Sequence, residues 1–343
     1  MKISLLFTIV CLVVFFCYAI FDRKIRTTAN QTITRDFSIC LKGILALLIV
    51  ACHLGDACGN KIPLSGYLSS IGTPVVGVFF FLSGYGLLKS YRQKGRDYLS
   101  SFFSRRLSKI VLPFLVISFF SFIIDYINND FNIDTYCIEM KKGYTPLPNS
   151  WFVYAIILFY LYFYICIKFF ASHVKAIMGI FVLLLIQAFL MFESQWPKYW
   201  YESSFCSIVG MVFFLWETSI VHLMRRNFVR LFIALFFLLF SILYYACLLD
   251  VPEDYFSIIR FTAIIVIPIT LGTIGLYIDS HKTLILKFLG TISYEIYLIH
   301  GLIIAILEDM CHNTMLFVAL VFLVSLFSAY ILHAMIQMIN FHK

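Results

Sequence analysis

Charged side chains are scarce in this sequence, because only 13% of its 343 residues are charged whereas 62% are hydrophobic. Soluble globular domains usually carry about 25% charged residues, so the composition excludes a chain built from water-soluble domains. The ten cysteines include no CxxC or Cys/His spacing of the kind that holds a metal, and we expect no metal site. The sequence leaves a disulfide open for the cysteines that are predicted to lie in loops: Cys58, Cys137 and Cys311.

Long hydrophobic runs, in contrast, fill the chain. They are about twenty residues long, which is enough for a helix to cross a hydrocarbon core of about 30 Å. The first run begins like a signal peptide, but it lacks a small-x-small cleavage site and is interpreted as a retained helix. We predict an all-α, polytopic membrane helix bundle of about eleven transmembrane helices. They are expected near residues 3–21, 37–55, 71–88, 110–127, 151–169, 175–192, 203–222, 230–249, 256–278, 286–307 and 315–338.

Basic residues are concentrated in every second predicted loop. Lys and Arg near span ends stay on the cytoplasmic side of a membrane, so we predict a multi-pass protein of the inner (plasma) membrane with its N-terminus outside and its C-terminus in the cytoplasm. The same clustering accounts for the net charge of +8 without a nucleic-acid partner. The basic loops contain Arg23, Lys24, Arg26 and Arg35; Lys89, Arg92, Lys94, Arg96, Arg105, Arg106 and Lys109; Lys168 and Lys175; Arg225, Arg226 and Arg230; Lys282 and Lys287.

Two ionisable residues, Lys42 and His53, interrupt the apolar stretch LKGILALLIVACHLGD. Eleven residues at 100° each amount to three turns plus about 20°, so both side chains lie on one stripe of the helix, about 16 Å apart along its axis. Ionisable groups inside a span usually face a bundle interior or a water-filled cavity and indicate function. The structural alternative is that Lys42 extends to the headgroups and His53 is a hydrogen-bonded interfacial histidine.

Five stretches carry a family resemblance. KGILALLIVACH places ten residues between a basic residue and a histidine, and it is followed by GVFFFLSGYGLL, FFSRRLSKIVLP, SWFVYAIILFYLY and LGTISYEIYLIHGLII. In this order they resemble the signatures of the acyltransferase type 3 family of membrane O-acyltransferases, from residue 35 to about residue 335. The chain departs from the family pattern at Lys109, which stands where the Arg-x-x-Arg motif has its second arginine. It also departs at Ile39 and Cys40, because the family often has an acidic residue there.

The resemblance implies a ten-helix acyltransferase domain over residues 31–343, preceded by an extra N-terminal transmembrane helix and basic loop over residues 1–30. It also implies transfer of an acyl group, commonly acetyl, from cytoplasmic acetyl-CoA or another acyl-CoA to a hydroxyl of an envelope polysaccharide or lipid-linked glycan. Cations suit the phosphates of such a donor, which indicates donor binding by Lys42, Arg105, Arg106 and Lys109. Some relatives carry a soluble esterase-like domain that this sequence lacks. We therefore expect the membrane unit to bind the acceptor itself or to hand the acyl group to a separate envelope partner protein.

His53 is the predicted catalytic residue. A sugar hydroxyl needs a base to take its proton, and histidine titrates near the working pH. Alternatively, His53 is acylated as a nucleophile and passes the group on. Asp56 could orient the imidazole if the helix extends that far, although Gly55 and Gly59 make an earlier helix end equally compatible with the sequence.

Other polar residues in the predicted spans are candidates for acceptor binding or support. Ser83 could stabilise an oxyanion, although serines in membrane helices usually bond to backbone and the neighbouring glycines favour close packing. Glu295 and His300 are about 140° apart on their helix and cannot both face one cavity, whereas Tyr297 and His300 share a stripe with Ser293. His300 is interpreted first as a structural hydrogen-bonding residue. Arg260 could contact an anionic sugar, but it is interpreted first as extending to the headgroups. Three further residues near predicted inner span ends are interpreted as facing water or headgroups: Glu217, His222 and His333.

A transporter or flippase of an envelope precursor, coupled to protons through the intramembrane His, Glu and Lys residues, is the competing hypothesis. Transporter folds often show paired halves with interrupted helices at corresponding positions, and neither feature is found in this sequence. A non-enzymatic scaffold would leave Lys42 and His53 without a role.

Overall fold

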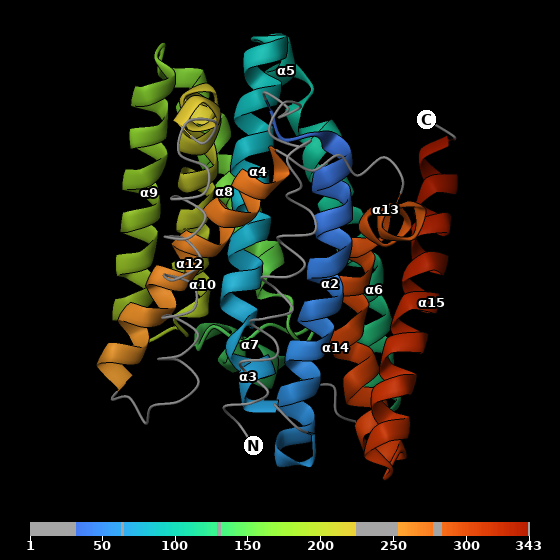
Figure 1. The fold of residues 1–343 in the computed structure, drawn as a ribbon. Coiled ribbons are helices and arrows are strands. Elements are labelled where there is room, and N and C mark those ends of the chain that lie inside the picture. Colours follow the sequence, from blue (N-terminus) through green and yellow to red (C-terminus); the bar gives the residue numbers. More distant parts are fainter. Residues whose placement is uncertain (1–31, 63–64, 129–131, 224–252, 277–282, 342–343) are drawn as a thin grey trace.

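The structure is a computed structural model that describes residues 32–62, 65–128, 132–223, 253–276 and 283–341. Every regular element in these residues is helical, and most helices stand side by side in one bundle (Figure 1). The all-α prediction is therefore confirmed for the described part of the chain. The long helices are α2 (Arg35–Cys58), α4 (Gly72–Lys94), α6 (Ser108–Ile127), α8 (Trp151–Phe169), α9 (His173–Glu193), the helical span Tyr199–Leu223, α12 (Glu253–Gly275), α14 (Ser293–Met310) and α15 (Thr314–Phe341).

Among the described residues, seven helices are long and apolar enough to cross a membrane, and an eighth span results if the bent pair α13–α14 counts as one. The chain is thus a multi-pass membrane protein. The predicted spans 3–21 and 230–249 lie outside the described residues, as does the whole of the proposed N-terminal unit 1–30 with its basic residues. The apolar part of α12 is shorter than a full span. The count of about eleven therefore remains a prediction.

Helix α2 begins and ends at residues suited to those positions. The Thr34 side chain accepts a hydrogen bond from the backbone N–H of Phe37 and caps the first turn. At the other end Gly59 adopts a positive φ of 51°, which glycine tolerates best, and terminates the helix after Cys58. Asp56 is therefore helical, which satisfies the condition that the sequence set for contact with His53.

Helices α2 and α4 form the centre of the bundle. Helix α2 contacts α4, α14 and two short helices, α3 (Ser65–Ser70) and α13 (Leu284–Thr291). Helix α4 crosses the span Tyr199–Leu223 closely, because a Cβ atom on Gly84 would collide with the backbone of Ser207 and one on Gly210 with that of Phe81. Small residues permit this approach of two membrane helices. Gly84 beside Ser83 thus has the packing role that the sequence favoured, whereas a Cβ atom on Gly86 would meet no neighbour within 4 Å.

The outer helices expose apolar faces. In the most apolar part of the span Phe103–Ile127 only 17% of residues are buried, against 67% in Gly72–Lys94. A helix that is apolar on all sides but exposed on most of them suits lipid as its solvent. Lys42 on α2 and Lys89 on α4, by contrast, are partly buried among protein atoms, where charged groups need polar partners.

Two predicted boundaries are wrong. The basic segment 89–109 was expected to be a loop, but α4 continues to Lys94, α5 (Asp97–Ser100) follows, and a π-helical turn, Phe103–Leu107, leads directly into α6. The expected span 286–307 is broken at Ile292, where α13 and α14 meet with a bend of 65°. Hydrophobicity alone reveals neither feature. The π turn FSRRL contains no glycine or proline that would mark it, whereas the break follows Gly290, a residue of low helix propensity.

Polar residues in the bundle pair with each other more than the sequence suggested. Arg260 contacts Glu202 at 2.8 Å, and His333 contacts Glu295 at 2.7 Å. The buried Glu217 carboxylate accepts a hydrogen bond of 2.6 Å from the Tyr85 hydroxyl. The interpretation of Glu217 as facing water or headgroups is therefore wrong, because Glu217 is buried. For Arg260 and His333, whose side chains keep 23% and 21% of their area exposed, that interpretation remains a prediction.

The cysteines predicted to lie in loops are partly in helices. Cys58 is the last residue of α2, and Cys137 lies within α7 (Ile133–Lys141). Both of them, like Cys311 after α14, are free thiols in the structure, so these three form no disulfide there.

Candidate functional site

Four predicted donor-binding residues line one cavity of about 210 Å³, which we call the basic cavity. Lys42 comes from the first half of α2, Arg105 and Arg106 come from the π turn, and Lys109 comes from the start of α6. A π turn widens the helix by one residue and changes the directions of its side chains. The predicted convergence of these cations is confirmed as geometry, while their role remains a proposal.

Arg106 is the most firmly held of these cations. Its Nε donates to the Tyr98 hydroxyl at 2.9 Å, and Nη2 donates to Ser90 Oγ at 3.3 Å. Arg105 and Lys109 are exposed. The basic cavity therefore combines one oriented guanidinium with two cations that can adjust to an anionic ligand. Ser83 also lines this cavity, away from His53.

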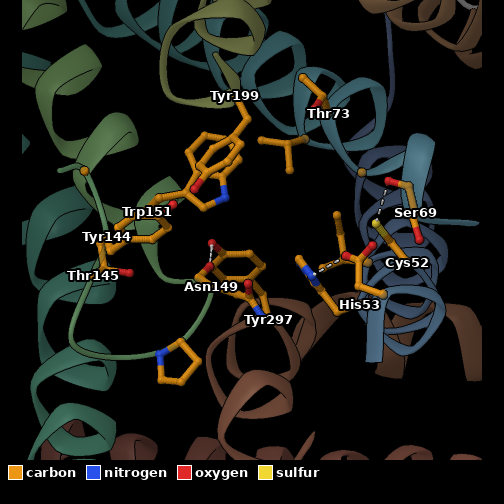
Figure 2. A pocket seen from close by; sticks show the side chains of 16 residues that line it. Cys52, His53, Ser69, Thr73, Tyr144, Thr145, Asn149, Trp151, Tyr199 and Tyr297 are labelled. Carbon is orange, nitrogen blue, oxygen red and sulfur yellow. Dashed lines mark hydrogen bonds and ion pairs between the residues drawn. The ribbon is translucent and has the colours of Figure 1, made fainter. Parts of the chain in front are cut away.

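A second cavity of about 440 Å³, the histidine cavity, contains His53 and Asp56 (Figure 2). His53 is on the second half of α2 and points across the cavity toward Trp151 and Tyr199. Its Nδ1 lies 3.5 Å from Asp56 Oδ2. Asp56 is thus placed to favour the tautomer of His53 that carries its proton on Nδ1. In this tautomer Nε2 has a free lone pair and can accept a proton.

His300 on α14 supports His53 from behind. The two imidazole rings stack with centroids 5.1 Å apart and an interplanar angle of 29°. His300 is fully buried, and its Nδ1 lies 2.6 Å from the carbonyl oxygen of Tyr297. Because a carbonyl can only accept, Nδ1 carries a proton. Nε2 of His300 has no hydrogen-bond partner within the described ranges, so the ring is neutral and acts on His53 by packing.

Tyr297 and Val76 line both cavities, which therefore adjoin at these two residues. Tyr297 also donates a hydrogen bond from its hydroxyl to the carbonyl oxygen of Asn149 (Figure 2). The cations beside Lys42 and the imidazole of His53 therefore lie in neighbouring cavities that share Tyr297 and Val76 as lining residues.

Of the other predicted support residues, Tyr297 and His300 are brought to His53 whereas Glu295 is not. Glu295 pairs with His333 on α15, as expected from the 140° that separate it from His300. Ser293 lines the basic cavity and donates its hydroxyl hydrogen to Gly290 O at 2.9 Å. Ser293 therefore shares a cavity with Tyr297 but not with His53, and its role remains a prediction.

The opposite wall of the histidine cavity was missed in the sequence. It consists of the aromatic residues Tyr144, Trp151 and Tyr199, with Thr145 and Asn149 between them (Figure 2). The only signal was the turn-forming TPLPNS before Trp151, which indicated a loop and an interfacial anchor but no ligand.

Three potential metal ligands lie close together, because the ligand atoms of Cys52, His53 and Asp56 are within 4.8 Å of one another. The Cys52 thiol, however, donates to the carbonyl oxygen of Ser69 at 3.4 Å. A metal would require the thiolate instead. The expectation of no metal remains a prediction.

Comparison with known proteins gives one result. A family model described as an acyltransferase domain matches residues 35–334. No curated protein and no solved structure matches the chain.

Proposed function

Because this chain belongs to the acyltransferase type 3 family, whose model matches residues 35–334, we propose that it is a membrane O-acyltransferase. It moves an acyl group, commonly acetyl, from acyl-CoA to a hydroxyl of an envelope polysaccharide or lipid-linked glycan. One observation carries the proposal: a cavity lined by four cations adjoins a cavity that contains a histidine with a carboxylate beside it.

The donor binds with its phosphates in the basic cavity. Arg106, Arg105 and Lys109 supply the opposite charges, and Lys42 extends the cationic wall toward the junction. The thin pantetheine arm then passes Val76 and Tyr297 and brings the thioester to His53. The separation of Lys42 and His53 along α2, about 16 Å, is of the order that such an arm spans.

His53 acts as the general base. Its Nε2 takes the proton from the acceptor hydroxyl while the oxygen attacks the thioester carbonyl carbon. The tetrahedral intermediate then collapses with cleavage of the C–S bond, and His53 returns the proton to the leaving thiolate. Asp56 stabilises the imidazolium that forms between these steps, and His300 keeps the ring from rotating.

The proposal also assigns the two sides of the membrane. Acyl-CoA is cytoplasmic, so the basic cavity opens to the cytoplasm and the histidine cavity opens to the outside. The charge distribution of the sequence supports this orientation. A proton-coupled transporter would use the same ionisable residues, but membership in an acyltransferase family favours group transfer.

The experiment compares envelope O-acyl esters, measured by mass spectrometry, in cells that contain the wild-type protein, His53→Ala or no protein. General-base catalysis typically contributes about 10²- to 10⁴-fold, so His53→Ala should reduce the ester content to the level without the protein. The control is His312→Ala, since His312 is exposed and lines neither cavity. Ester content unchanged by His53→Ala, at equal protein level in the membrane, would overturn the proposal.

A second measurement separates the base from the covalent carrier. Purified protein is incubated with acetyl-CoA alone, quenched and digested. A base mechanism predicts an unmodified peptide around His53, whereas an acetyl group on that histidine would replace the direct transfer with a two-step transfer.

A further inference from the structure

The aromatic wall of the histidine cavity faces the proposed base directly. Tyr144, Trp151 and Tyr199 line the side opposite His53, and the rings of Trp151 and Tyr199 lie 5.1 Å apart at 48° (Figure 2). Sugars have an apolar face of C–H groups and a rim of hydroxyls. An aromatic surface with a few polar groups at its edge matches both parts of such a ligand.

This wall is rigid before any ligand arrives. The indole of Trp200 donates to the carbonyl oxygen of Gly143 at 2.7 Å, and that of Trp196 donates to Lys141 O at 3.0 Å. On the other side Tyr297 donates to Asn149 O, and Asn149 has a positive φ of 60° that this anchored loop maintains. A wall held at both ends orients a ligand at little entropic cost.

The wall also reaches the protein surface. Tyr144 is 52% exposed, and the Asp56 side chain on the facing helix is 56% exposed. A chain of sugars can therefore extend out of the cavity while one unit lies against the wall. Only that unit has to match the chemistry around His53.

The charged side chain that lines the histidine cavity next to the bound sugar unit is negative. No lysine or arginine lines the histidine cavity in the part of the chain that the structure describes, and Asp56 is its carboxylate. A carboxylate or phosphate on the reacting unit would lose water, find no cation and approach Asp56. Such an unpaired charge is strongly disfavoured.

Resting on the proposed function, we infer that the aromatic wall is the acceptor subsite and that it accepts an uncharged sugar unit. Units that carry a carboxylate or a phosphate beside the reacting hydroxyl are excluded. The subsite thus selects neutral over anionic sugar units at the position that becomes acylated. The rest of the glycan can carry charges, because it lies outside the cavity.

The test maps the esters to individual sugar units by tandem mass spectrometry of envelope glycan fragments from cells with the wild-type protein and with His53→Ala. Esters that depend on His53 are expected on neutral units. Their occurrence on uronic acid or phosphorylated units would overturn the inference while leaving the proposed function intact. Absence of any ester that depends on His53 would overturn the proposed function itself, and the inference with it.

A variant tests the wall independently. Tyr144→Ala removes one exposed ring and is expected to lower acylation about 3- to 10-fold at limiting acceptor, with the half-saturating acetyl-CoA concentration unchanged in membrane vesicles. Tyr126→Ala is the matched control, because Tyr126 is 73% exposed and lines neither cavity. Equal acylation by both variants, or an altered donor dependence in Tyr144→Ala, would remove the wall from the acceptor subsite.

Discussion

The two cavities share one helix but differ in almost every chemical property. Near Lys42 the lining carries four cations, whereas around His53 the described lining carries no lysine or arginine. Among the described residues, Val76 and Tyr297 line both cavities. This difference suggests that each cavity is adapted to one substrate, an anionic donor in the first and a polar, uncharged acceptor in the second, and that the reaction takes place where they join.

Closing the junction should have the largest effect. Val76→Phe adds a ring between the cavities, so acyl transfer should fall by about 100-fold or more, because a misplaced thioester loses its alignment with His53. Binding of acetyl-CoA to detergent-solubilised protein, measured by calorimetry, should change by only a few-fold.

The matched control for this prediction is Val75→Phe. Val75 is also buried, but it lines neither cavity, so the variant carries the same overpacking without blocking the junction. If both variants lose transfer equally, the cavities do not communicate at Val76.

Removal of the oriented cation should affect only the donor side. In Arg106→Ala the half-saturating acetyl-CoA concentration should rise about 10- to 100-fold, since charged hydrogen bonds contribute about 1.5–3 kcal/mol. Arg106→Lys should recover only part of this loss, because lysine lacks the planar fork. Steady-state kinetics in membrane vesicles measures both.

Arg96→Ala serves as the control, since Arg96 is exposed and outside the basic cavity. An unchanged donor dependence in Arg106→Ala would exclude Arg106 from the donor site.

Neutralising the carboxylate beside His53 should affect only the rate. Asp56→Asn is expected to lower kcat about 10-fold with the donor KM unchanged, because the amide holds the ring less well and does not stabilise the imidazolium. The exposure of Asp56 keeps the effect modest. Asp134→Asn, an exposed acid on α7, is the control. A change in donor KM with normal kcat would contradict the assignment.

A change in ionic strength should have the smallest effect, and it should change the half-saturating concentration of the donor but not that of the acceptor. Salt at about 0.3 M rather than about 0.05 M shortens the screening length, so the half-saturating acetyl-CoA concentration should rise a few-fold. The half-saturating acceptor concentration should stay constant. Equal shifts for the two substrates would contradict the assignment of charge to one cavity alone.

The features that periodicity encodes were predictable. The common stripe of Lys42 and His53 follows from helix geometry alone, and the family resemblance indicated that Arg105, Arg106 and Lys109 would approach Lys42. The separation of Glu295 from His300 followed from the angle between them.

Features that depend on contacts between helices were not predictable. Nothing within α14 indicates that His300 stacks on His53 of α2 or that Glu295 finds His333. The aromatic wall escaped prediction because its residues come from three places: a connecting segment, the first turn of α8 and a helix about fifty positions later. A loop that is built by indole hydrogen bonds from Trp196 and Trp200 leaves no periodic pattern.

The anchored segment between Gly143 and Trp151 has a consequence for engineering. It contributes to the wall that faces His53 but supplies no cation to the basic cavity. Its anchors lie outside the segment itself: the indoles of Trp196 and Trp200 hold its N-terminal end, and the Tyr297 hydroxyl holds it near the other end. Grafting a different sequence between the same anchors should therefore redirect the enzyme to new hydroxyl compounds while coenzyme use stays as it is, which makes this short stretch the natural place to build libraries for altered selectivity.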